Sequence, residues 1–275
     1  MGTPTVVFTD LDGTLLDGRT YSPAAAREAV RALVRRAIPV VFCSSKTAAE
    51  QRPLRAELNL EAMPFIAENG SAIYVPVVSE LPPAEGFALS ATGTEWVRVL
   101  GLSAAVVRER IQRVAAAAGV PLTGYASLST ARLATLASLD PAAADRAKQR
   151  EFSETLIDQH PPHVWERLEQ AFAAEGLVCR HGGRFRTVTG AASDKGRAVR
   201  IVAALYARKH GTAVTTVGLG DSANDVPMLA AVTRAYLVAR EDGTWACVTL
   251  AGLRRVAQPG PLGWSTAVAE VLAQA

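Results

Sequence analysis

Two acidic motifs, each directly after a short apolar run, constrain the fold of this chain more than any other feature. The first is Asp10-Leu11-Asp12-Gly13-Thr14, which follows the apolar residues Val6 to Thr9. The second is Gly220-Asp221-Ser222-Ala223-Asn224-Asp225, which follows Val214 to Val217. Short apolar runs that end in such turns are typical of buried parallel strands. Ligands of open α/β sheets bind beyond the carboxyl ends of the strands, so two motifs at strand ends in one sheet are brought to the same edge.

The alternation of strands and helices around these motifs predicts an α/β fold, with a Rossmann-like, mostly parallel sheet and helices on both faces. Ser22-Pro23 is typical of a helix N-terminus, and apolar spacing carries that helix to near Ile38. Thr47 and Glu50 form a capping box, and Asn69-Gly70 predicts a hairpin. After the first motif the predicted elements are, in order, a helix from Ser22, a strand over Pro39 to Cys43, a helix from Thr47 to about Leu58, and a strand at Ile66 that turns into Ala72 to Val78.

The middle third of the chain has a different pattern, which predicts an insertion. Long Ala- and Arg-rich helical segments, such as Ser103 to Ala118 and His163 to Glu175, alternate with short strand-like pieces. The α/β pattern resumes near Ser193, with a helix over Lys195 to Lys209. We therefore expect residues 1–80 and 191–275 to form the catalytic core and residues 81–190 to form an inserted α+β domain.

Composition and charge exclude several classes of protein. Apolar residues make up 49% of the chain and charged residues 20%, which fits a globular protein and not a disordered one. The net charge of +3 is dispersed, so we expect no nucleic-acid partner, and no apolar run is long enough to predict a membrane partner. Three widely spaced cysteines, Cys43, Cys179 and Cys247, predict free thiols and a cytoplasmic location.

Candidate chemistry gathers at the predicted strand ends. Four carboxylates, Asp10, Asp12, Asp221 and Asp225, would repel one another if they lay close together, and a divalent cation such as Mg²⁺ resolves that repulsion. Ser44-Ser45-Lys46 ends another predicted strand, where hydroxyl and backbone N–H groups suit phosphoryl oxygens. Lys195 opens a helix and can place a positive charge on a phosphate. Taken singly, each pattern is also typical of a turn or a helix cap.

Together and in this order, these motifs resemble those of the haloacid dehalogenase superfamily of phosphatases. The resemblance covers about Thr5 to Ser79 and the chain from Ser193 onward. It implies that Asp10 is a nucleophile that forms an aspartyl-phosphate and that Asp12 is the general acid and base. It also implies that Ser44 hydrogen-bonds the phosphoryl group, that Lys195 neutralises it, and that Asp10, Asp12, Asp221 and Asp225 form the Mg²⁺ site. In that superfamily the metal usually meets the backbone carbonyl of the residue equivalent to Asp12.

Further stretches resemble mannosyl-3-phosphoglycerate phosphatases, and among them are Pro64 to Gly70, Arg150 to Glu154 and Gly182 to Phe185. This resemblance implies a small phosphorylated sugar-glycerate substrate, which is hydrolysed to mannosylglycerate and phosphate. It also implies that the insertion recognises the leaving group. A guanidinium can hold a glycerate carboxylate at two points, which favours Arg150 and Arg184. The substrate-binding candidates are Ser45, Lys46, Asn69, Arg150, Ser153, Arg184 and Asn224.

Three alternatives remain open from the sequence. The substrate can be the glucosyl ester or another sugar phosphate instead of the mannosyl ester. A phosphomutase of the same superfamily would carry the same core motifs. A non-catalytic sugar-phosphate sensor is disfavoured, because a sensor needs no nucleophile.

Overall fold

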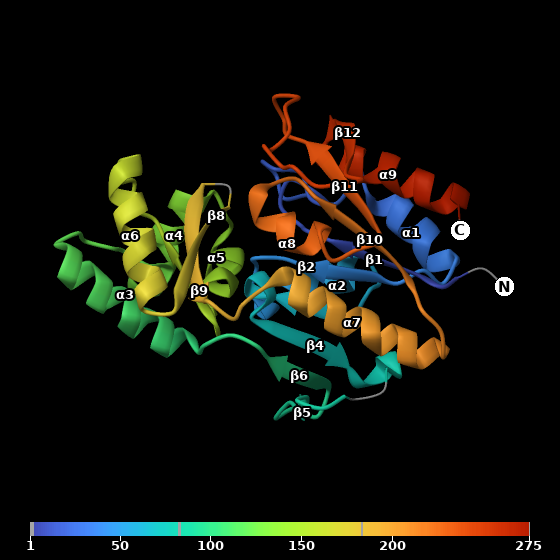
Figure 1. Ribbon diagram of the computed structural model, residues 1–275, viewed down its shortest axis with the longest axis horizontal. Helices are drawn as coiled ribbons and strands as arrows, with labels where there is room; N and C mark the ends of the chain where they lie inside the picture. Colours follow the sequence, from blue (N-terminus) through green and yellow to red (C-terminus); the bar gives the residue numbers. More distant parts are fainter. Residues whose placement is uncertain (1–2, 82–83, 183, 275) are drawn as a thin grey trace.

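A computed structural model describes residues 3–81, 84–182 and 184–274 of the chain. Its larger sheet has nine strands in the order β12-β11-β10-β1-β2-β3-β4-β6-β5 (Figure 1). The strands from β12 to β3 are parallel, and the remaining ones are antiparallel, which confirms the predicted mostly parallel α/β sheet. The strands are β1 (Thr5–Thr9), β2 (Val40–Cys43), β3 (Phe65–Ala67), β4 (Ala72–Pro76), β5 (Ala88–Leu89), β6 (Glu95–Val99), β10 (Thr215–Gly220), β11 (Arg234–Ala239) and β12 (Arg254–Pro259).

Helices cover both faces of this sheet, because successive side chains of a strand point to opposite faces. On β1, Val7 belongs to the apolar cluster that contains α1 and α9, whereas Val6 and Phe8 belong to the cluster of α7 and α8. The helical elements of this part are α1 (Arg27–Arg35), α2 (Ala48–Glu57), η1 (Glu68–Gly70), η2 (Val77–Ser79), α7 (Lys195–His210), η4 (Ala223–Asp225), α8 (Val226–Leu229) and α9 (Gly260–Gln274).

A second unit, which we call the inserted unit and define as residues 100–190, forms the other lobe in Figure 1. Its antiparallel sheet has the order β7-β9-β8. Apolar side chains of α3 and α6 cluster with this sheet around Val188, whereas α4 and α5 cluster around Tyr125. The elements are α3 (Ala104–Ala118), η3 (Tyr125–Ser127), α4 (Thr130–Ala137), α5 (Pro141–Lys148), β7 (Ser153–Leu156), α6 (Pro162–Ala174), β8 (Leu177–Gly182) and β9 (Phe185–Gly190).

The start of the inserted unit differs from the expected position at residue 81. Strands β5 and β6 continue the nine-stranded sheet beyond β4, so that sheet includes residues as far as Val99. Chain breakers such as Gly86 and polar residues such as Thr94 separate these short strands, and they therefore have no periodic signal in the sequence. We propose that the insertion begins at residue 100 and not at residue 81.

The first helix also begins later than predicted. Ser22 does not cap a helix; its hydroxyl accepts a hydrogen bond from the N–H of Ala24 at 3.2 Å, within a turn. Helix α1 starts at Arg27, after Ala26. Thr47 and Glu50, in contrast, form the predicted capping box of α2.

Two further expectations concern membrane-spanning helices and the state of the cysteines. None of the described helices has the length and apolar character needed to cross a membrane. Cys43, Cys179 and Cys247 are all free thiols, as predicted.

Candidate active site

The ends of β1 and β10 and the start of α7 bring three predicted residues into contact. The ammonium of Lys195 donates to Asp10 Oδ1 at 2.7 Å and to Asp225 Oδ1 at 2.7 Å. All three side chains are buried, and Lys195 is only 2% exposed. Asp194 fixes the start of α7 by accepting a hydrogen bond from the N–H of Arg197 at 2.6 Å. Lys195 is therefore held at the carboxyl edge of the sheet.

Asp221 completes a cluster of three carboxylates with Asp10 and Asp225, whose oxygens lie within 4.8 Å of one another. Asp221 Oδ1 accepts a hydrogen bond from the Thr14 hydroxyl at 3.2 Å. Asp225 Oδ2 accepts from the backbone N–H groups of Asp221 at 3.1 Å and Ser222 at 3.2 Å, which closes the loop after β10. Three carboxylates with hard oxygen donors and a single neighbouring ammonium suit a divalent cation such as Mg²⁺.

Burial and mutual repulsion set the electrostatics of this cluster. Burial raises the pKa of Asp10 well above its ordinary value, and the charges of Asp225 and Asp221 add to that rise, against the effect of Lys195. Burial, followed by repulsion from Asp225, raises the pKa of Asp221 to about 7. Burial disfavours the charged form of Lys195, but Asp10 and Asp225 outweigh it and keep its pKa above the ordinary value. The cluster therefore favours additional positive charge.

Two glycines allow the close approach of the segments that carry these residues. Gly13 has φ of +76°, and a Cβ there would lie 2.9 Å from Asp221 Oδ2. Gly70 has φ of +87°, and a Cβ there would collide with the backbone of Asp194. Both positions combine a left-handed backbone with no space for a side chain. The hairpin at Gly70 thus packs against the residue that precedes Lys195.

Asp12 faces away from the carboxylate cluster. Its side chain is 39% exposed, and Lys46 Nζ lies 3.1 Å from Asp12 Oδ1 and 3.6 Å from Glu50 Oε1. The carboxylate of Asp12 is therefore not a member of the three-carboxylate cluster, whereas the group of Asp12 expected to meet the metal is its backbone carbonyl. Lys46, three residues after the end of β2, offers Asp12 an opposite charge instead.

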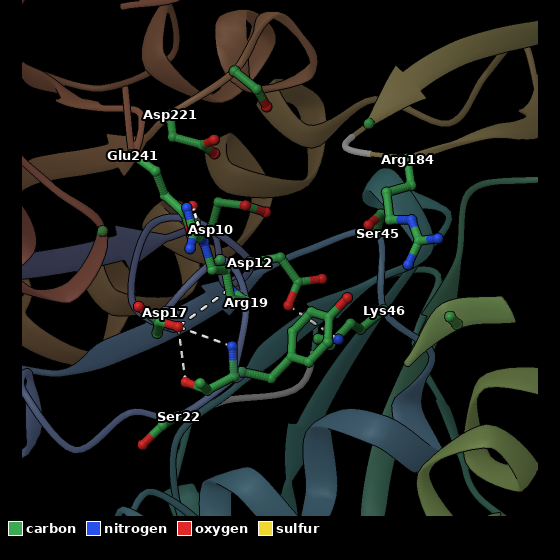
Figure 2. Close-up of a pocket in the computed structure, with 18 of the residues that line it drawn as sticks. Asp10, Asp12, Asp17, Arg19, Ser22, Ser45, Lys46, Arg184, Asp221 and Glu241 are labelled. Atoms are coloured by element: carbon green, nitrogen blue, oxygen red, sulfur yellow. Dashed lines mark hydrogen bonds and ion pairs between the residues drawn. The ribbon is translucent and has the colours of Figure 1, made fainter. Parts of the chain in front are cut away.

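A cavity of about 840 Å³ lies over these residues, between the sheet edge and the inserted unit. Figure 2 shows Asp10 and Asp221 on one side of it and Arg184 on the other. The predicted site residues at its wall are Asp10, Asp12, Ser45, Lys46, Arg150, Arg184, Asp221 and Asn224. One cavity thus brings together residues from both parts of the chain.

Arg150 and Arg184 have different surroundings in this cavity. One guanidinium nitrogen of Arg150 donates to the Ser45 carbonyl at 3.2 Å and to the Ser153 hydroxyl at 3.0 Å. Arg184 is exposed at the turn between β8 and β9, and its guanidinium lies over the ring of Phe185 and donates to Ser138 Oγ at 3.4 Å. Gly183 of the same motif lies outside the described residues. Arg184 is therefore the more accessible of the two cations.

The other predicted residues do not line the cavity. Ser44 is buried, and its hydroxyl oxygen accepts from the N–H of Lys46 at 3.2 Å. Asn69 is buried in the hairpin, and the Ser153 hydroxyl donates to Glu68. For Asn69 and Ser153 this differs from the predicted contact with substrate, and for Ser44 it differs from the predicted hydrogen bond to the phosphoryl group. Such burial arises from tertiary packing, which a motif of a few residues does not reveal.

The structure adds residues that the sequence does not single out. Tyr21, Glu50, Tyr125 and Glu241 line the cavity. The sequence identifies Glu50 only as part of a capping box, and the proximity of its second carboxylate oxygen to Lys46 has no signal there. Tyr21 lies just after the first acidic motif, and its left-handed backbone, with φ of +56°, is uncommon for a tyrosine.

Comparisons with known proteins agree with this geometry. Residues 7–80 match the sequence profile of a haloacid dehalogenase-like hydrolase. A curated protein from Methanococcoides burtonii, named glucosyl-3-phosphoglycerate/mannosyl-3-phosphoglycerate phosphatase, is 34% identical and covers 97% of each chain. A mannosyl-3-phosphoglycerate phosphatase from Pyrococcus horikoshii is 33% identical over 85% of this chain and 90% of its own.

Solved structures share the fold at low sequence identity. The sucrose-phosphatase from Synechocystis, solved with sucrose and phosphate, superposes with a TM-score of 0.61 at 16% identity and covers 98% of both chains. A likeness at this identity supports the fold, including an inserted unit, and leaves the substrate open.

Proposed function

Because the chain belongs to the haloacid dehalogenase-like phosphatases and is a phosphoric monoester hydrolase, we propose that it hydrolyses mannosyl-3-phosphoglycerate to mannosylglycerate and phosphate. The observation that carries this proposal is the cavity that joins the Asp10, Asp221 and Lys195 cluster to the exposed guanidinium of Arg184. The glucosyl ester is the second candidate, since the relative from Methanococcoides burtonii is named for both esters.

In the proposed reaction, Asp10 is the nucleophile. Its carboxylate attacks phosphorus, the bond from phosphorus to the glycerate oxygen breaks, and Asp12 gives that oxygen a proton. Water then attacks the aspartyl-phosphate while Asp12 takes its proton, which releases phosphate and regenerates Asp10. Lys195 stays within 2.7 Å of Asp10 and offsets negative charge on both the carboxylate and the phosphoryl group.

We infer that Asp10 and Asp221, supported by Asp225, hold Mg²⁺. When bound, Mg²⁺ neutralises phosphoryl charge and polarises the phosphorus–oxygen bond. The donor set fits, since all three residues offer carboxylate oxygens within 4.8 Å of one another. Asp225 also accepts hydrogen bonds from Lys195 and from the N–H of Asp221 in the loop after β10. Its part is therefore chiefly to position Lys195 and Asp221.

The leaving group extends toward the inserted unit. Arg184 supplies a guanidinium for the glycerate carboxylate, and Arg150 shapes the wall through Ser45. Asn224 and Ser45 add polar groups at the wall. A substrate enclosed between the two parts is also shielded from water, which strengthens electrostatic interactions in the cavity.

Phosphate release over a panel of esters tests the assignment. We expect kcat/KM with Mg²⁺ to be highest for mannosyl- or glucosyl-3-phosphoglycerate, at least about 100-fold above simple hexose phosphates, because only the former carry a carboxylate. A hexose phosphate that is the better substrate would contradict the proposal. Product analysis separates the alternatives: a mutase would return an isomerised sugar phosphate, and a sensor would bind without releasing phosphate.

We also propose a cytoplasmic location. Its support is the cysteine usage, since the free thiols of Cys43, Cys179 and Cys247 fit a reducing compartment.

A further inference from the structure

Tyr21 has a backbone conformation that is uncommon for a bulky residue, with φ of +56°. The loop before it imposes this conformation. Asp17 Oδ1 accepts from the N–H groups of Thr20 at 2.8 Å and Arg19 at 3.2 Å, and the Asp17 carbonyl accepts from the N–H of Tyr21 at 3.0 Å. The N–H of Asp17 donates in turn to the Ser22 carbonyl at 3.0 Å. Strain of this kind persists where the surroundings impose it and clusters at functional sites.

The ring of Tyr21 lies against the ammonium of Lys46, whose Nζ is 4.9 Å from the ring centroid. The same ammonium lies 3.1 Å from Asp12 and 3.6 Å from Glu50. Glu50 is fixed by its other oxygen, which accepts from the N–H of Thr47 at 2.8 Å. Lys46 is therefore held between the Tyr21 ring and Glu50, and its side chain is only 15% exposed.

Asp12 is less restrained than Lys46. Its side chain is 39% exposed, and among the described residues its ion-pair partner is Lys46. A general acid must lie within hydrogen-bond reach of the oxygen that it protonates. A carboxyl group that rotated freely at the cavity wall would spend much of its time out of that reach. The orientation of Asp12 thus depends on a lysine that is itself held from two sides.

We propose that Tyr21 is a positioning residue that acts through Lys46 to hold the carboxyl group of Asp12 in one orientation at the cavity wall. The inference rests on the proposed acid role of Asp12. The tyrosine hydroxyl makes no hydrogen bond within the described part of the chain, so the ring face and not the hydroxyl does this work. The strained loop places that ring, and Glu50 holds the opposite side of the ammonium.

The choice of substrates separates this role from a structural one. When phosphorus leaves an alkyl oxygen, the alkoxide needs the proton of Asp12, whereas para-nitrophenolate is stable enough to leave without it. The ratio kcat/KM covers only steps up to that departure, so the later attack of water does not enter. Glycerol 3-phosphate and para-nitrophenyl phosphate are suitable probes. Neither carries a sugar or a carboxylate, so the result does not depend on which glycosyl ester is the substrate.

We expect Lys46→Met to lower kcat/KM for glycerol 3-phosphate by about 10- to 100-fold and that for para-nitrophenyl phosphate by less than about threefold. Tyr21→Leu should lower the former by about 3- to 30-fold, the size of a partly desolvated cation–π contact, and Tyr21→Phe should restore most of it. In the Lys46→Met background, Tyr21→Leu should add no further loss. Arg254→Met is the matched control, because Arg254 lies over the ring of Tyr236, outside the cavity.

Two results would overturn the inference. Equal losses on both probes in Tyr21→Leu would mean that the tyrosine supports the fold or the phosphoryl site. An undiminished effect of Tyr21→Leu in the Lys46→Met background would mean that it does not act through Lys46.

Discussion

Lys195 shows how much of this site rests on single residues. A buried ammonium and two buried carboxylates, each 2.7 Å from it, cost free energy of desolvation that their attraction only partly offsets. Removing Lys195 would leave the two carboxylates without a counter-charge, whereas removing the charge of Asp10 would leave Lys195 paired with Asp225. A buried ion cluster of this kind contributes little to the stability of the fold. The proposed phosphoryl chemistry explains why the chain nevertheless buries it.

Replacing Asp10 by asparagine tests the nucleophile. Asp10→Asn keeps the shape of the side chain but removes the anion that attacks phosphorus, so we expect activity to fall at least about 1,000-fold. The melting temperature should change little, because the amide oxygen can still accept from Lys195. Initial rates of purified, Mg²⁺-supplemented protein measure the first quantity. Turnover near the wild-type rate would rule out the covalent route.

Asp221 gives the metal-free protein a pH-dependent stability. Its pKa of about 7 lies above the ordinary value near 3.8, so the native state binds more protons than the unfolded state between these pH values. Stability from this residue is therefore full below about pH 4 and falls as pH rises toward 7. With a chelator present, we expect the unfolding free energy to drop by on the order of 2 kcal/mol between pH 5 and 8.

The variant Asp221→Asn is the control for this effect, since an amide does not titrate. Denaturant titrations of both proteins at several pH values should show a shallower pH dependence in the variant. The same slope in both would mean that other groups cause it. Mg²⁺ added at pH 8 should stabilise the wild type more than the variant, because the cation offsets the same repulsion.

Single residues were predictable where a motif names them in a fixed local context. Asp10, Asp221 and Lys195 each follow or begin a strongly patterned element, and the structure brings them together. Ser153 and Asn69 belong to equally suggestive motifs but are buried, and Tyr21 belongs to no motif at all. Whether such residues face the cavity depends on packing between segments far apart in the chain, which local patterns do not contain.

At the scale of elements, the hairpin of β3 and β4 positions α7. Glu68, Asn69 and Gly70 all have positive φ, and Gly70 meets the backbone of Asp194 so closely that no Cβ fits. The hairpin thereby sets where α7 starts, and with it the height of Lys195 over the sheet edge. The turn at Glu68–Gly70 thus contributes to the position of α7, in addition to the strands that it joins.

Substituting alanine at this turn measures that contact. Gly70→Ala should cost about 2–4 kcal/mol, because backbone strain and a steric clash add together. Gly93→Ala is the matched control and should cost only about 1 kcal/mol, since Gly93 also has positive φ, of +71°, but a Cβ there would have no neighbouring atom within 4 Å. Denaturant unfolding gives both values. Equal costs would contradict a role for close packing at Gly70.

Elements with clear end signals were predictable, and those without were not. Thr47 caps α2 as expected, and the helix expected from Ser103 is present as α3, where the Ser103 side chain accepts a backbone hydrogen bond at the helix start. Ser22-Pro23 carries a similar signal but opens a turn, of which Ser22, Ala24 and Ala25 line the cavity. Strand β5 has two residues and only its pairing with β6 defines it, so nothing in its own sequence announces it.

At the scale of the whole molecule, the cavity divides the proposed work between two parts. The sheet edge carries the residues that act on phosphorus, and the inserted unit contributes Arg150 and Arg184. The helix α5 of that unit approaches α2 of the core, where the Thr47 hydroxyl donates to the Arg146 carbonyl at 3.0 Å. This contact joins the inserted unit to the core at the side of the cavity formed by Lys46 and Glu50.

This division predicts a selective effect of Arg184. If its guanidinium grips the glycerate carboxylate, Arg184→Ala should cost about 2–4 kcal/mol in kcat/KM for mannosyl-3-phosphoglycerate. The loss on para-nitrophenyl phosphate should be small, because that ester has no carboxylate. Arg184→Lys should restore little of the activity, because an ammonium lacks the planar pair of N–H donors of a guanidinium. Arg132→Ala, an exposed arginine of the same unit outside the cavity, serves as control. Equal losses on both esters would assign Arg184 to the fold instead.

The central place of β1 in the sheet has a consequence for how the protein is made. β1 pairs with β2 on one side and with β10 on the other, yet β10 ends only at Gly220. On the ribosome, the nascent chain therefore carries one unpaired apolar edge of β1 until residues 215–220 have been made, and such an edge is prone to pair with other chains. Because Asp221 and Asp225 follow β10, a nascent chain holds Asp10 without these two carboxylates and has no complete cluster until residues 221–225 have been made.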